Sequence, residues 1–454
     1  MTALWSSAEI AAATNGRASL EFEARGVAFD SREVGPGDLF VALKGEATDG
    51  HRFVGQALSQ GASGVLASQP VDGPHVLVSD TANALDALGV ASRARTAAKV
   101  VGVTGSVGKT SVKEALFAAF DRAAPGRAHR SLKSYNNHVG VPLSLARMPR
   151  ETRFGVFEMG MNHAGELAAL TRLVRPHVAL VTTVALAHGA FFADESAIAD
   201  AKGEIFQGLE PGGTAIIPYD SPHRDRLIAA ARPYAAEIVT FGRDPAADVH
   251  ARDGVSGPRG TLVRAKLRSA ELSFTVGPPG EHWVTNALAV LAVVEAAGGD
   301  LAAAGLALAD LAGLPGRGQR ITIHLPDGDA LLIDESYNAN PASMRATLAM
   351  LGQERGRKVA ILGAMRELGP EEARHHADLA APIAAAGVGL ALLVGTEMKP
   401  LAEALEGRVE FVHVPDAAAA AAQASSLIAP GDAVLVKGSN SVGLAGVVDA
   451  LAGG

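Results

Sequence analysis

Short apolar runs alternate with helix-like stretches from about residue 97 onward, and this alternation is the feature that most constrains the fold. Each run has the length of a strand, and each connection is long enough to hold a helix. Parallel strands need such crossover connections, because a tight turn joins only antiparallel strands. The pattern therefore predicts a parallel sheet covered by helices. The first runs are KVVGVT (99–104), FGVFEM (154–159), VALVTT (178–183), GTAIIP (213–218) and EIVTF (237–241).

The same alternation begins again after residue 320 and predicts a second α/β sheet, of Rossmann-like type. Between the two regions, the polar and Gly/Pro-rich stretch 242–281 favours hairpins, and NALAVLAVVEAA (286–297) predicts a helix ended by two glycines. GLPGRGQR (313–320) has the composition of a linker. The later runs are ALLID (330–334), KVAILG (358–363), LALLVG (390–395), VEFVHV (409–414) and DAVLVKG (432–438).

The first 80 or so residues follow a different pattern. Short strands and turn residues in 26–45 precede a predicted helix over 51–62, which indicates a small α/β domain. We therefore predict an α/β protein of three domains. They are a small α/β N-terminal domain (1–80), a central domain with a P-loop ATPase-like parallel sheet and flanking helices (81–314), and a Rossmann-like α/β C-terminal domain (315–454).

A run of six alanines directly after Asp416 has the look of a low-complexity segment. Alanine has the highest helix propensity, aspartate is a favoured N-cap, and the Pro430-Gly431 pair would end a helix. We therefore predict a capped helix at this place rather than a disordered segment.

Composition excludes several kinds of partner and site. The chain has no cysteine, which rules out disulfides and thiolate metal ligands and is typical of a reducing cytoplasm. The net charge is −8 and 4% of residues are aromatic, so we expect no nucleic-acid partner. No apolar run reaches the length of a membrane span and no signal-peptide pattern is present, so we expect a cytoplasmic chain without membrane insertion. Coiled-coil heptads are also missing, and we expect a monomer.

The stretch GVTGSVGKTSVKEAL (102–116) places a turn of small residues between a predicted strand and a predicted helix. Backbone N–H groups of such a turn, the helix N-terminus and Lys109 favour phosphate, and Thr110 offers a hydroxyl to Mg²⁺. Val103 stands where the full G-x-x-x-x-G-K-[ST] pattern has glycine, so the motif is a shortened variant. An ordinary strand–helix turn is the alternative, but the order of elements favours a nucleoside triphosphate. The predicted phosphate cradle comprises Gly105, Ser106, Val107, Gly108, Lys109, Thr110 and Ser111.

Three polar residues near the ends of later strands are candidates for the same site. Glu158 ends a predicted strand, where a carboxylate suits Mg²⁺. His188 follows the strand VALVTT, and Lys202 lies at the start of a helix predicted over 202–209. Each also has an ordinary explanation as a surface, capping or solvated residue. Only the neighbouring phosphate cradle favours a functional role.

Four motifs together resemble the Mur ligases, a family of ATP-dependent, amide-forming enzymes of peptidoglycan synthesis. The resemblance spans nearly the whole chain, and the family's three domains, for UDP-sugar, ATP and the incoming amino compound, match the three predicted segments. Stretches 30–53 and 334–348 are similar to those of the member that joins D-alanyl-D-alanine to UDP-N-acetylmuramoyl-tripeptide. The four motifs are TGSVGKTS (104–111), NNHVGVPLSL (136–145), EMGMNHAGEL (158–167) and AKGEIF (201–206).

The resemblance implies roles for individual residues of this chain. It implies ATP at the phosphate cradle, two Mg²⁺ ions held with Thr110, Glu158 and His188, and a Lys202 that carbon dioxide carbamylates into an anionic ligand. Lys109, His188 and Lys202 would then be catalytic. The implied nucleotide contacts are Asn286, Arg317 and Asp334. The implied substrate contacts are Ser31, Arg32, Lys44, Asp49 and His51 for the uridine diphosphate, Asn136 and Asn137 for the acyl end, and Asn338, Asn340 and Ser343 for the dipeptide.

Several positions depart from the family motifs. Ala364 and Asn440 lack charges that family members often carry in the third domain, whereas the phosphate and metal residues are intact. No motif selects between diaminopimelate and lysine as the third residue of the tripeptide. The departures are Pro218 after AII, Trp283 in GEHW, Glu335 in DESYNANP, Ala364 in LGAM and Asn440 in KGSN.

The reaction that the resemblance implies is activation of a carboxylate by ATP to an acyl phosphate, followed by attack of an amine. His376 occupies a family histidine position and is a candidate base. ATP contacts implied on both sides of residue 315 indicate that domain closure assembles the site. Two alternatives stay open. One is a related ligase, such as folylpolyglutamate synthase or an enzyme that adds one amino acid, and the other is a nucleotide-gated switch that hydrolyses ATP without ligation.

Overall fold

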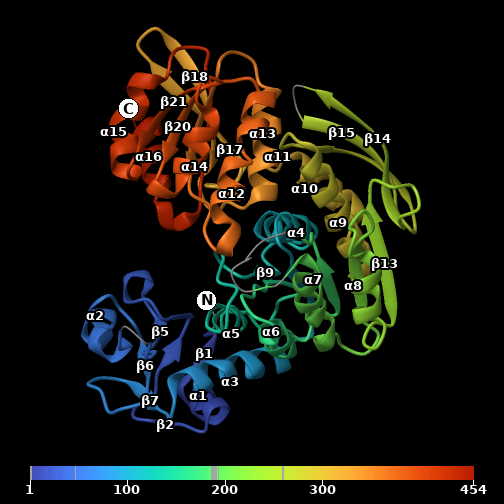
Figure 1. Cartoon of the computed structure of the whole chain (residues 1–454). Coiled ribbons are helices and arrows are strands. Elements are labelled where there is room, and N and C mark those ends of the chain that lie inside the picture. The colour runs from blue at the N-terminus through green and yellow to red at the C-terminus, as the bar shows by residue number, and fades with distance from the viewer. Residues whose placement is uncertain (1–2, 46–47, 186–191, 193, 258–259, 454) are drawn as a thin grey trace.

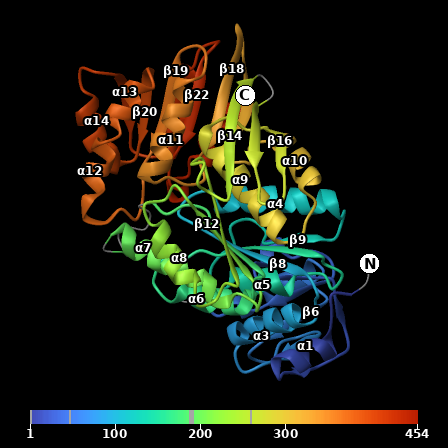
Figure 2. The same ribbon diagram turned by 90° about the vertical axis from the view of Figure 1, so that its right-hand side faces the viewer.

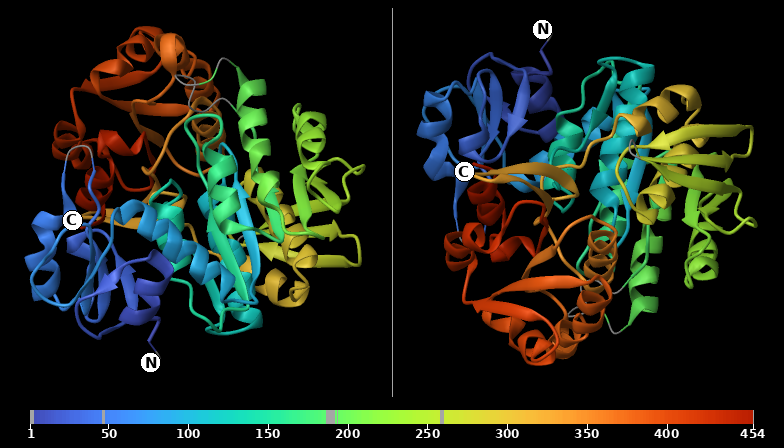
Figure 3. Two further views of the ribbon diagram at one scale, coloured as in Figure 1. Left: turned by 90° about the horizontal axis from the view of Figure 1, so that it is seen from below. Right: turned by 90° about the horizontal axis from the view of Figure 1, so that it is seen from above.

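Three sheets of five or more strands organise the chain in the computed structural model, which describes all residues except 1–2, 46–47, 186–191, 193, 258–259 and 454. Figure 1 shows the N-terminal part in blue, the central part in teal to yellow and the C-terminal part in orange and red. Views from below and above place the blue and red parts on the same side of the central part (Figure 3). The predicted α/β class is confirmed, and the boundaries after residues 80 and 314 stay a prediction.

The central sheet has the strand order β16-β15-β14-β13-β12-β11-β8-β10-β9. Its strands from β9 to β14 pair in parallel, as the alternation predicts, and β14, β15 and β16 pair antiparallel in the predicted hairpin region. The strands are β8 (Lys99–Thr104), β9 (Ala128–Arg130), β10 (Phe154–Glu158), β11 (Val178–Val181), β12 (Thr214–Pro218), β13 (Glu237–Gly242), β14 (Val249–Gly257), β15 (Gly260–Lys266) and β16 (Glu271–Val276).

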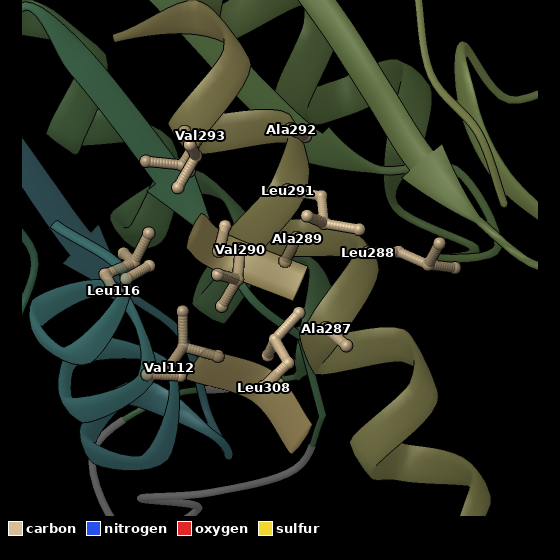
Figure 4. Packing of buried hydrophobic residues seen from close by; sticks show 14 of the residues in the cluster. Val112, Leu116, Ala287, Leu288, Ala289, Val290, Leu291, Ala292, Val293 and Leu308 are labelled. Atoms are coloured by element: carbon tan, nitrogen blue, oxygen red, sulfur yellow. The ribbon is translucent and has the colours of Figure 1, made fainter. Parts of the chain in front are cut away.

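Helices cover both faces of the central sheet. The apolar side chains of α4, α9 and α10 join one buried cluster with the strands, and those of α5 to α8 join the cluster on the other face. In Figure 4, Val290 of α9 lies beside Val112 and Leu116 of α4. Fully burying each such side chain stabilises the fold by about 1.5–3 kcal/mol. The helices are α4 (Lys109–Ala123), α5 (Gly140–Ala146), α6 (Glu166–Val174), α7 (Glu195–Gly203), α8 (Arg224–Ala231), α9 (Glu281–Ala296) and α10 (Leu301–Ala309).

Lys202 lies in the last turn of α7, and the predicted helix start at this residue was wrong. The helix begins after Asp194, whose side chain accepts a hydrogen bond from the Ala197 N–H at 2.9 Å. Gly203 keeps α-helical backbone angles, with φ −61°, and a 3₁₀ segment (Glu204–Gly208) follows it. The chain therefore stays helical from Lys202 through Gly203 into the 3₁₀ segment, and the N-cap of the helix is Asp194, well before Lys202.

The C-terminal sheet has the order β17-β18-β22-β19-β20-β21, and only the β17–β18 hairpin is antiparallel. Figure 2 shows this region, in orange and red, beside the central helices. Its strands are β17 (Gln319–Leu325), β18 (Gly328–Glu335), β19 (Lys358–Gly363), β20 (Val388–Val394), β21 (Glu410–Val414) and β22 (Ala433–Lys437). Its helices are α11 (Pro341–Gly352), α12 (Glu372–Ala377), α13 (Ala380–Ala385), α14 (Lys399–Leu405), α15 (Ala417–Leu427) and α16 (Ala445–Ala452).

The N-terminal sheet, of order β2-β7-β6-β5-β4, packs against the central region through α5. The Trp5 indole Nε1 donates to the Ala146 carbonyl at 2.9 Å across this junction. The strands are β1 (Trp5–Ser6), β2 (Arg17–Ala18), β3 (Glu23–Ala24), β4 (Gly26–Ala28), β5 (Asp38–Val41), β6 (Gly64–Ala67) and β7 (His75–Leu77), and β1 pairs with β3 outside the sheet. The helices are α1 (Ser7–Thr14), α2 (Val54–Ser59) and α3 (Thr81–Ala94).

The alanine run forms α15, and the Asp416 side chain accepts a hydrogen bond from the Ala419 N–H at 2.8 Å, as predicted. Replacing Asp416 by alanine is expected to remove about 1 kcal/mol from the stability of this helix, because an amide of its first turn loses its partner. Amide hydrogen exchange over 417–427 should then be roughly five-fold faster. Asp416→Asn, which keeps a capping oxygen, is the control. Equal exchange in both variants would contradict the capping role.

Candidate active site

A cavity of about 700 Å³ lies between the central and C-terminal regions, at the carboxyl ends of β8 and β10. Most of the residues predicted for the ATP and dipeptide sites line it, although they come from segments far apart in the chain. His188 lies outside the described residues. The predicted residues that line the cavity are Ser106, Val107, Gly108, Lys109, Thr110, Ser111, Asn136, Glu158, Lys202, Asn286, Arg317, Asn338, Asn340 and Ser343.

The turn between β8 and α4 depends on its two glycines. Gly105 has φ +151°, and a Cβ there would lie 1.9 Å from the Thr182 Oγ1. Gly108 has φ +87°, in the left-handed region, and a Cβ there would lie 3.0 Å from the Asn286 Oδ1. The glycines thus permit the backbone path that brings the turn close to β11 and α9.

Lys109 begins α4, and its Nζ donates to the Gly105 carbonyl at 2.6 Å, which folds the side chain back over the turn. Burial lowers the pKa of Lys109, while the nearby Glu158 raises it and Arg317 lowers it. The lysine therefore lies where the phosphates of a nucleotide would meet the turn amides and the start of a helix.

Glu158 ends β10 almost fully buried, at 1% exposure, and each of its carboxylate oxygens accepts a hydrogen bond. The Thr110 hydroxyl donates to Oε2 at 2.8 Å, and the Asn136 Nδ2 donates to Oε1 at 2.8 Å. The backbone N–H of Glu158 donates to the Ser131 Oγ at 3.0 Å. This network places a hydroxyl and a carboxylate side by side next to the phosphate cradle.

The donors of this network fit Mg²⁺, which prefers oxygen ligands and is usually held by one or two carboxylates together with substrate phosphates. The Thr110 hydroxyl and the Glu158 carboxylate already touch, and both line the cavity. Lys113 Nζ lies 3.6 Å from Glu158 Oε2, within ion-pair distance of this carboxylate. Lys113 was missed in the sequence, although its position one helical turn after Lys109 was a usable signal.

Lys202 is buried in the wall of the cavity, with 2% of its surface exposed. Burial in the first place, and the positive charge of Lys109 in the second, lower the pKa of Lys202 well below its ordinary value. At neutral pH, a lysine with a lowered pKa is in its neutral amine form more often than a solvated lysine. The neutral amine is the form that reacts with carbon dioxide.

The linker after α10 joins the two sides of the cavity. The Arg317 guanidinium lies over the Tyr337 ring, 4.2 Å from its centroid, and its Nη2 donates to the Ser134 Oγ at 3.2 Å. Ser134 in turn lies 3.2 Å from the Thr110 Oγ1. Ser134 and Tyr337 were not predicted, because nothing in their local sequence indicates a contact with a distant segment.

Asp334 is buried but does not line the cavity. Its carboxylate accepts hydrogen bonds from the Gly316 N–H at 2.6 Å and from the Ser336 N–H at 3.0 Å. The residue thus holds the linker in place in this structure, and its predicted nucleotide contact stays a prediction. Asn137 also does not line the cavity, and its Oδ1 accepts from the Gly140 N–H at 2.9 Å near the start of α5.

The predicted dipeptide residues lie around the start of α11. Asn340 and Ser343 form a capping box, in which the Asn340 Oδ1 accepts from the Ser343 N–H at 2.8 Å and the Ser343 Oγ accepts from the Asn340 N–H at 3.0 Å. Lys437 holds the preceding loop, because its Nζ donates to the Asn338 carbonyl at 3.0 Å and to the Glu335 Oε2 at 3.1 Å. Glu335, one of the departures, therefore has a defined ionic partner.

The residues predicted to hold uridine diphosphate all lie in the N-terminal region and do not line the cavity. Arg32 pairs with Asp30, which lowers the pKa of that carboxyl to about 2, first through their hydrogen bond. His51 Nδ1 lies 2.6 Å from the Asp49 Oδ1, and its Nε2 accepts from the Ser68 N–H at 3.0 Å. The remaining two are Ser31, which donates to Gln56 at 3.1 Å, and the exposed Lys44.

The other positions singled out in the sequence lie in different surroundings. His376 is buried, does not line the cavity and accepts a hydrogen bond from the Met365 N–H at 2.9 Å through Nε2, and its role as a base stays a prediction. Ala364 is in the core of the third region, and Pro218 ends β12. Trp283 and Asn440 line the cavity. In the described part of the chain, no helix is both long and apolar enough to cross a bilayer.

Comparison with known proteins agrees with this arrangement. Family models described as the Mur ligase family catalytic domain, the Mur ligase middle domain and the Mur ligase glutamate ligase domain match residues 23–106, 103–294 and 316–440. The UDP-N-acetylmuramoyl-tripeptide–D-alanyl-D-alanine ligase of Escherichia coli is 37% identical over 94% of this chain and 93% of its own length. The enzyme of that name from Rickettsia prowazekii is 30% identical over 98% and 99%.

Solved structures give the same result. A structure of MurF from Acinetobacter baumannii superposes with a TM-score of 0.87 at 31% identity and covers 99% of both chains. MurF from Thermotoga maritima in complex with ADP gives 0.78 at 26% identity, over 95% of this chain and 97% of its own. A folylpolyglutamate synthase of Mycobacterium tuberculosis gives 0.63 at 18% identity over 81% of this chain and 95% of its own, which shows a shared fold alone. With its sequence similarity, three matched domains and ATP-type cradle, the chain belongs to the Mur ligase family.

Proposed function

We propose that this chain is the ATP-dependent ligase that joins D-alanyl-D-alanine to UDP-N-acetylmuramoyl-tripeptide, with release of ADP and phosphate. The observation that carries the proposal is that the phosphate cradle, Glu158 and Lys202 open on the same cavity as Asn338 of the C-terminal region. The relatives named for this reaction cover nearly the whole chain, so the activity is proposed for the whole protein.

The reaction needs two chemical steps, because a carboxylate is a resonance-stabilised anion without a leaving group. The tripeptide carboxylate first attacks the γ-phosphorus of ATP, so that ADP leaves and an acyl phosphate forms. The amine of the dipeptide then attacks the acyl carbon, loses a proton, and expels phosphate from the tetrahedral intermediate. Both steps need the reacting groups held together and the phosphate charge stabilised.

The residues of the central region would supply this stabilisation. The turn amides and Lys109 would bind the nucleotide phosphates, and Asn286 and Arg317 would contact the rest of the nucleotide from α9 and from the linker. Thr110, Glu158, His188 and a carbamylated Lys202 would hold two Mg²⁺ ions. Bound there, the ions would neutralise charge on the transferring phosphoryl group. Asn136, which already orients Glu158, would contact the acyl end of the sugar peptide.

The N-terminal region would bind the uridine diphosphate of the sugar peptide, and the C-terminal region would bind the dipeptide. Ser31, Arg32, Lys44, Asp49 and His51 would hold the uridine diphosphate, and an Arg/Lys pair suits a diphosphate. Asn338, Asn340 and Ser343 would lie on the dipeptide side, and Asp334 would fix the linker that carries Arg317. We also propose the division into residues 1–80, 81–314 and 315–454, a monomeric state and a cytoplasmic location.

The test is ADP release by the purified protein with ATP and Mg²⁺, with UDP-N-acetylmuramoyl-tripeptide and D-alanyl-D-alanine added separately and together. We expect release that requires both substrates, because the acyl phosphate forms only on the bound tripeptide and turns over only with the amine. Peptide-independent ADP release would overturn the ligase in favour of a nucleotide switch. Release with folate and glutamate, but not with the sugar peptide, would identify the other ligase.

A further inference from the structure

The described residues lining the cavity include five Lys or Arg side chains, and the dipeptide substrate brings a carboxylate that needs one of them. D-alanyl-D-alanine carries a terminal carboxylate that does not react, and a buried carboxylate without a partner is strongly unfavourable. Asn338, Asn340 and Ser343 supply no positive charge. The five side chains are Lys109, Lys202, Arg317, Arg366 and Lys437, of which Lys202 would be an anion when carbamylated as proposed above.

Two of these five side chains belong to the phosphate end of the cavity. Lys109 folds over the β8–α4 turn, with its Nζ 2.6 Å from the Gly105 carbonyl. Lys202 is buried at the end of α7, close enough to Lys109 for the two charges to affect each other. Both therefore lie at the β8–α4 turn, where the nucleotide phosphates would bind, and not at the C-terminal wall where the dipeptide would enter.

Two further cations already hold parts of the protein together. The Arg317 guanidinium lies on the Tyr337 ring and donates to Ser134. These contacts hold this linker residue next to the phosphate cradle. Lys437 is 2% exposed and holds Glu335 and the Asn338 carbonyl. Removing Lys437 from Glu335 would leave a carboxylate without its cation, so Lys437 is poorly suited to bind a second one.

Arg366 differs from the other four, because its backbone is fixed while its side chain is accessible. Its N–H donates to the Ser439 Oγ at 2.9 Å, and the Ser439 N–H donates to the Ala364 carbonyl at 3.0 Å, which ties the loop after β19 to the loop after β22. The side chain is 44% exposed. Arg366 is also ion-paired, with Glu397 through Nη1, but a guanidinium has five N–H donors, so Arg366 can keep this pair and still donate to a second carboxylate.

We infer that Arg366 binds the terminal carboxylate of the incoming dipeptide, an inference that rests on the proposed function. The fork of a guanidinium matches the two oxygens of a carboxylate. Ala364 and Asn440, which follow β19 and β22 next to Arg366, are uncharged, and Arg366 is the exposed one among the Lys and Arg side chains described at the cavity. Bound in this way, the dipeptide would direct its amine toward the phosphate end.

The experiment compares two substrates in two proteins. The substrates are D-alanyl-D-alanine and its C-terminal amide, which has the same shape without the charge, and the proteins are wild type and Arg366→Gln. In the wild type, the amide should have a kcat/KM roughly 10- to 100-fold lower than the dipeptide, as expected for losing a charge-assisted hydrogen-bonded pair. In Arg366→Gln, kcat/KM for the dipeptide should fall by a similar factor, while kcat/KM for the amide should change little. The KM for ATP should stay the same.

A matched control and a second variant make the result decisive. Arg374 lies in the same region, is highly exposed and does not line the cavity, so Arg374→Ala should discriminate like the wild type. Arg366→Lys, which keeps the charge but loses the fork, should show intermediate discrimination. If Arg366→Gln is poorly folded, Arg366→Lys alone tests the inference, and discrimination equal to wild type would overturn it.

Failure of this inference is separable from failure of the proposed function. Absence of dipeptide-dependent ADP release in the wild type would overturn the ligase itself. An active wild type with an Arg366→Gln variant that still prefers the dipeptide to the amide by the same factor would overturn only the role of Arg366. A wild type that uses dipeptide and amide equally well would show that the carboxylate is not bound by any cation. That result would also overturn the role of Arg366.

Discussion

Replacing Lys109 by alanine is expected to reduce kcat for substrate-dependent ADP release by about 10²- to 10³-fold, the usual cost of removing one preorganised group that stabilises charge in a transition state. The Nζ of Lys109 lies over the β8–α4 turn and is held by the Gly105 carbonyl at 2.6 Å. A phosphate bound by the turn amides would meet this ammonium directly. In a buried site the attraction between the two is much stronger than in water.

The matched control is Lys99→Ala, because Lys99 begins the same β8 strand but is exposed at its other end. That variant should retain wild-type kcat, and both variants should unfold at temperatures close to that of the wild type. Lys109→Arg should recover part of the loss, since the charge is kept while the reach and shape change. Wild-type turnover in Lys109→Ala would remove the phosphate cradle from the mechanism.

Replacing Lys202 by alanine is expected to reduce kcat on the order of 10²-fold, and short carboxylic acids such as acetate or propionate should restore part of it. The sign of the pKa shift supports this. Burial and Lys109 lower the pKa of Lys202, so its neutral amine is already populated at pH values below its ordinary pKa. Only the neutral amine adds carbon dioxide, and the product is an anion. An added carboxylate would fill the same space with the same charge.

Lys109→Ala is the control for this rescue, because it loses a cation beside the same cavity and should not respond to a carboxylic acid. The measurement is kcat of each variant against acid concentration, at constant ionic strength. Full activity of Lys202→Ala without any acid would contradict the carbamate, and so would equal rescue of the two variants. Loss of carbon dioxide from the buffer should also lower the activity of the wild type.

Strand positions in this chain could be predicted because they depend on local patterns. KVVGVT and KVAILG were predicted over 99–104 and 358–363, and the structure gives β8 and β19 these same bounds. A buried parallel strand is a short apolar run by necessity, since both its faces are covered. The helix that carries Lys202 was misread, because its N-cap at Asp194 lies outside the motif that drew attention to it.

The sequence alone determined the fold class and the phosphate cradle, because a parallel strand, two glycines and a lysine at a helix start are local features with one joint physical reason. Tertiary structure decided what surrounds the cradle. Ser134 meets Arg317 across 183 residues of chain, and Lys437 meets Glu335 across 102, and no local pattern encodes either contact. It also decided that the Arg366 side chain is exposed at the cavity while Lys202 and Lys437 are buried, since burial arises only when distant segments pack together.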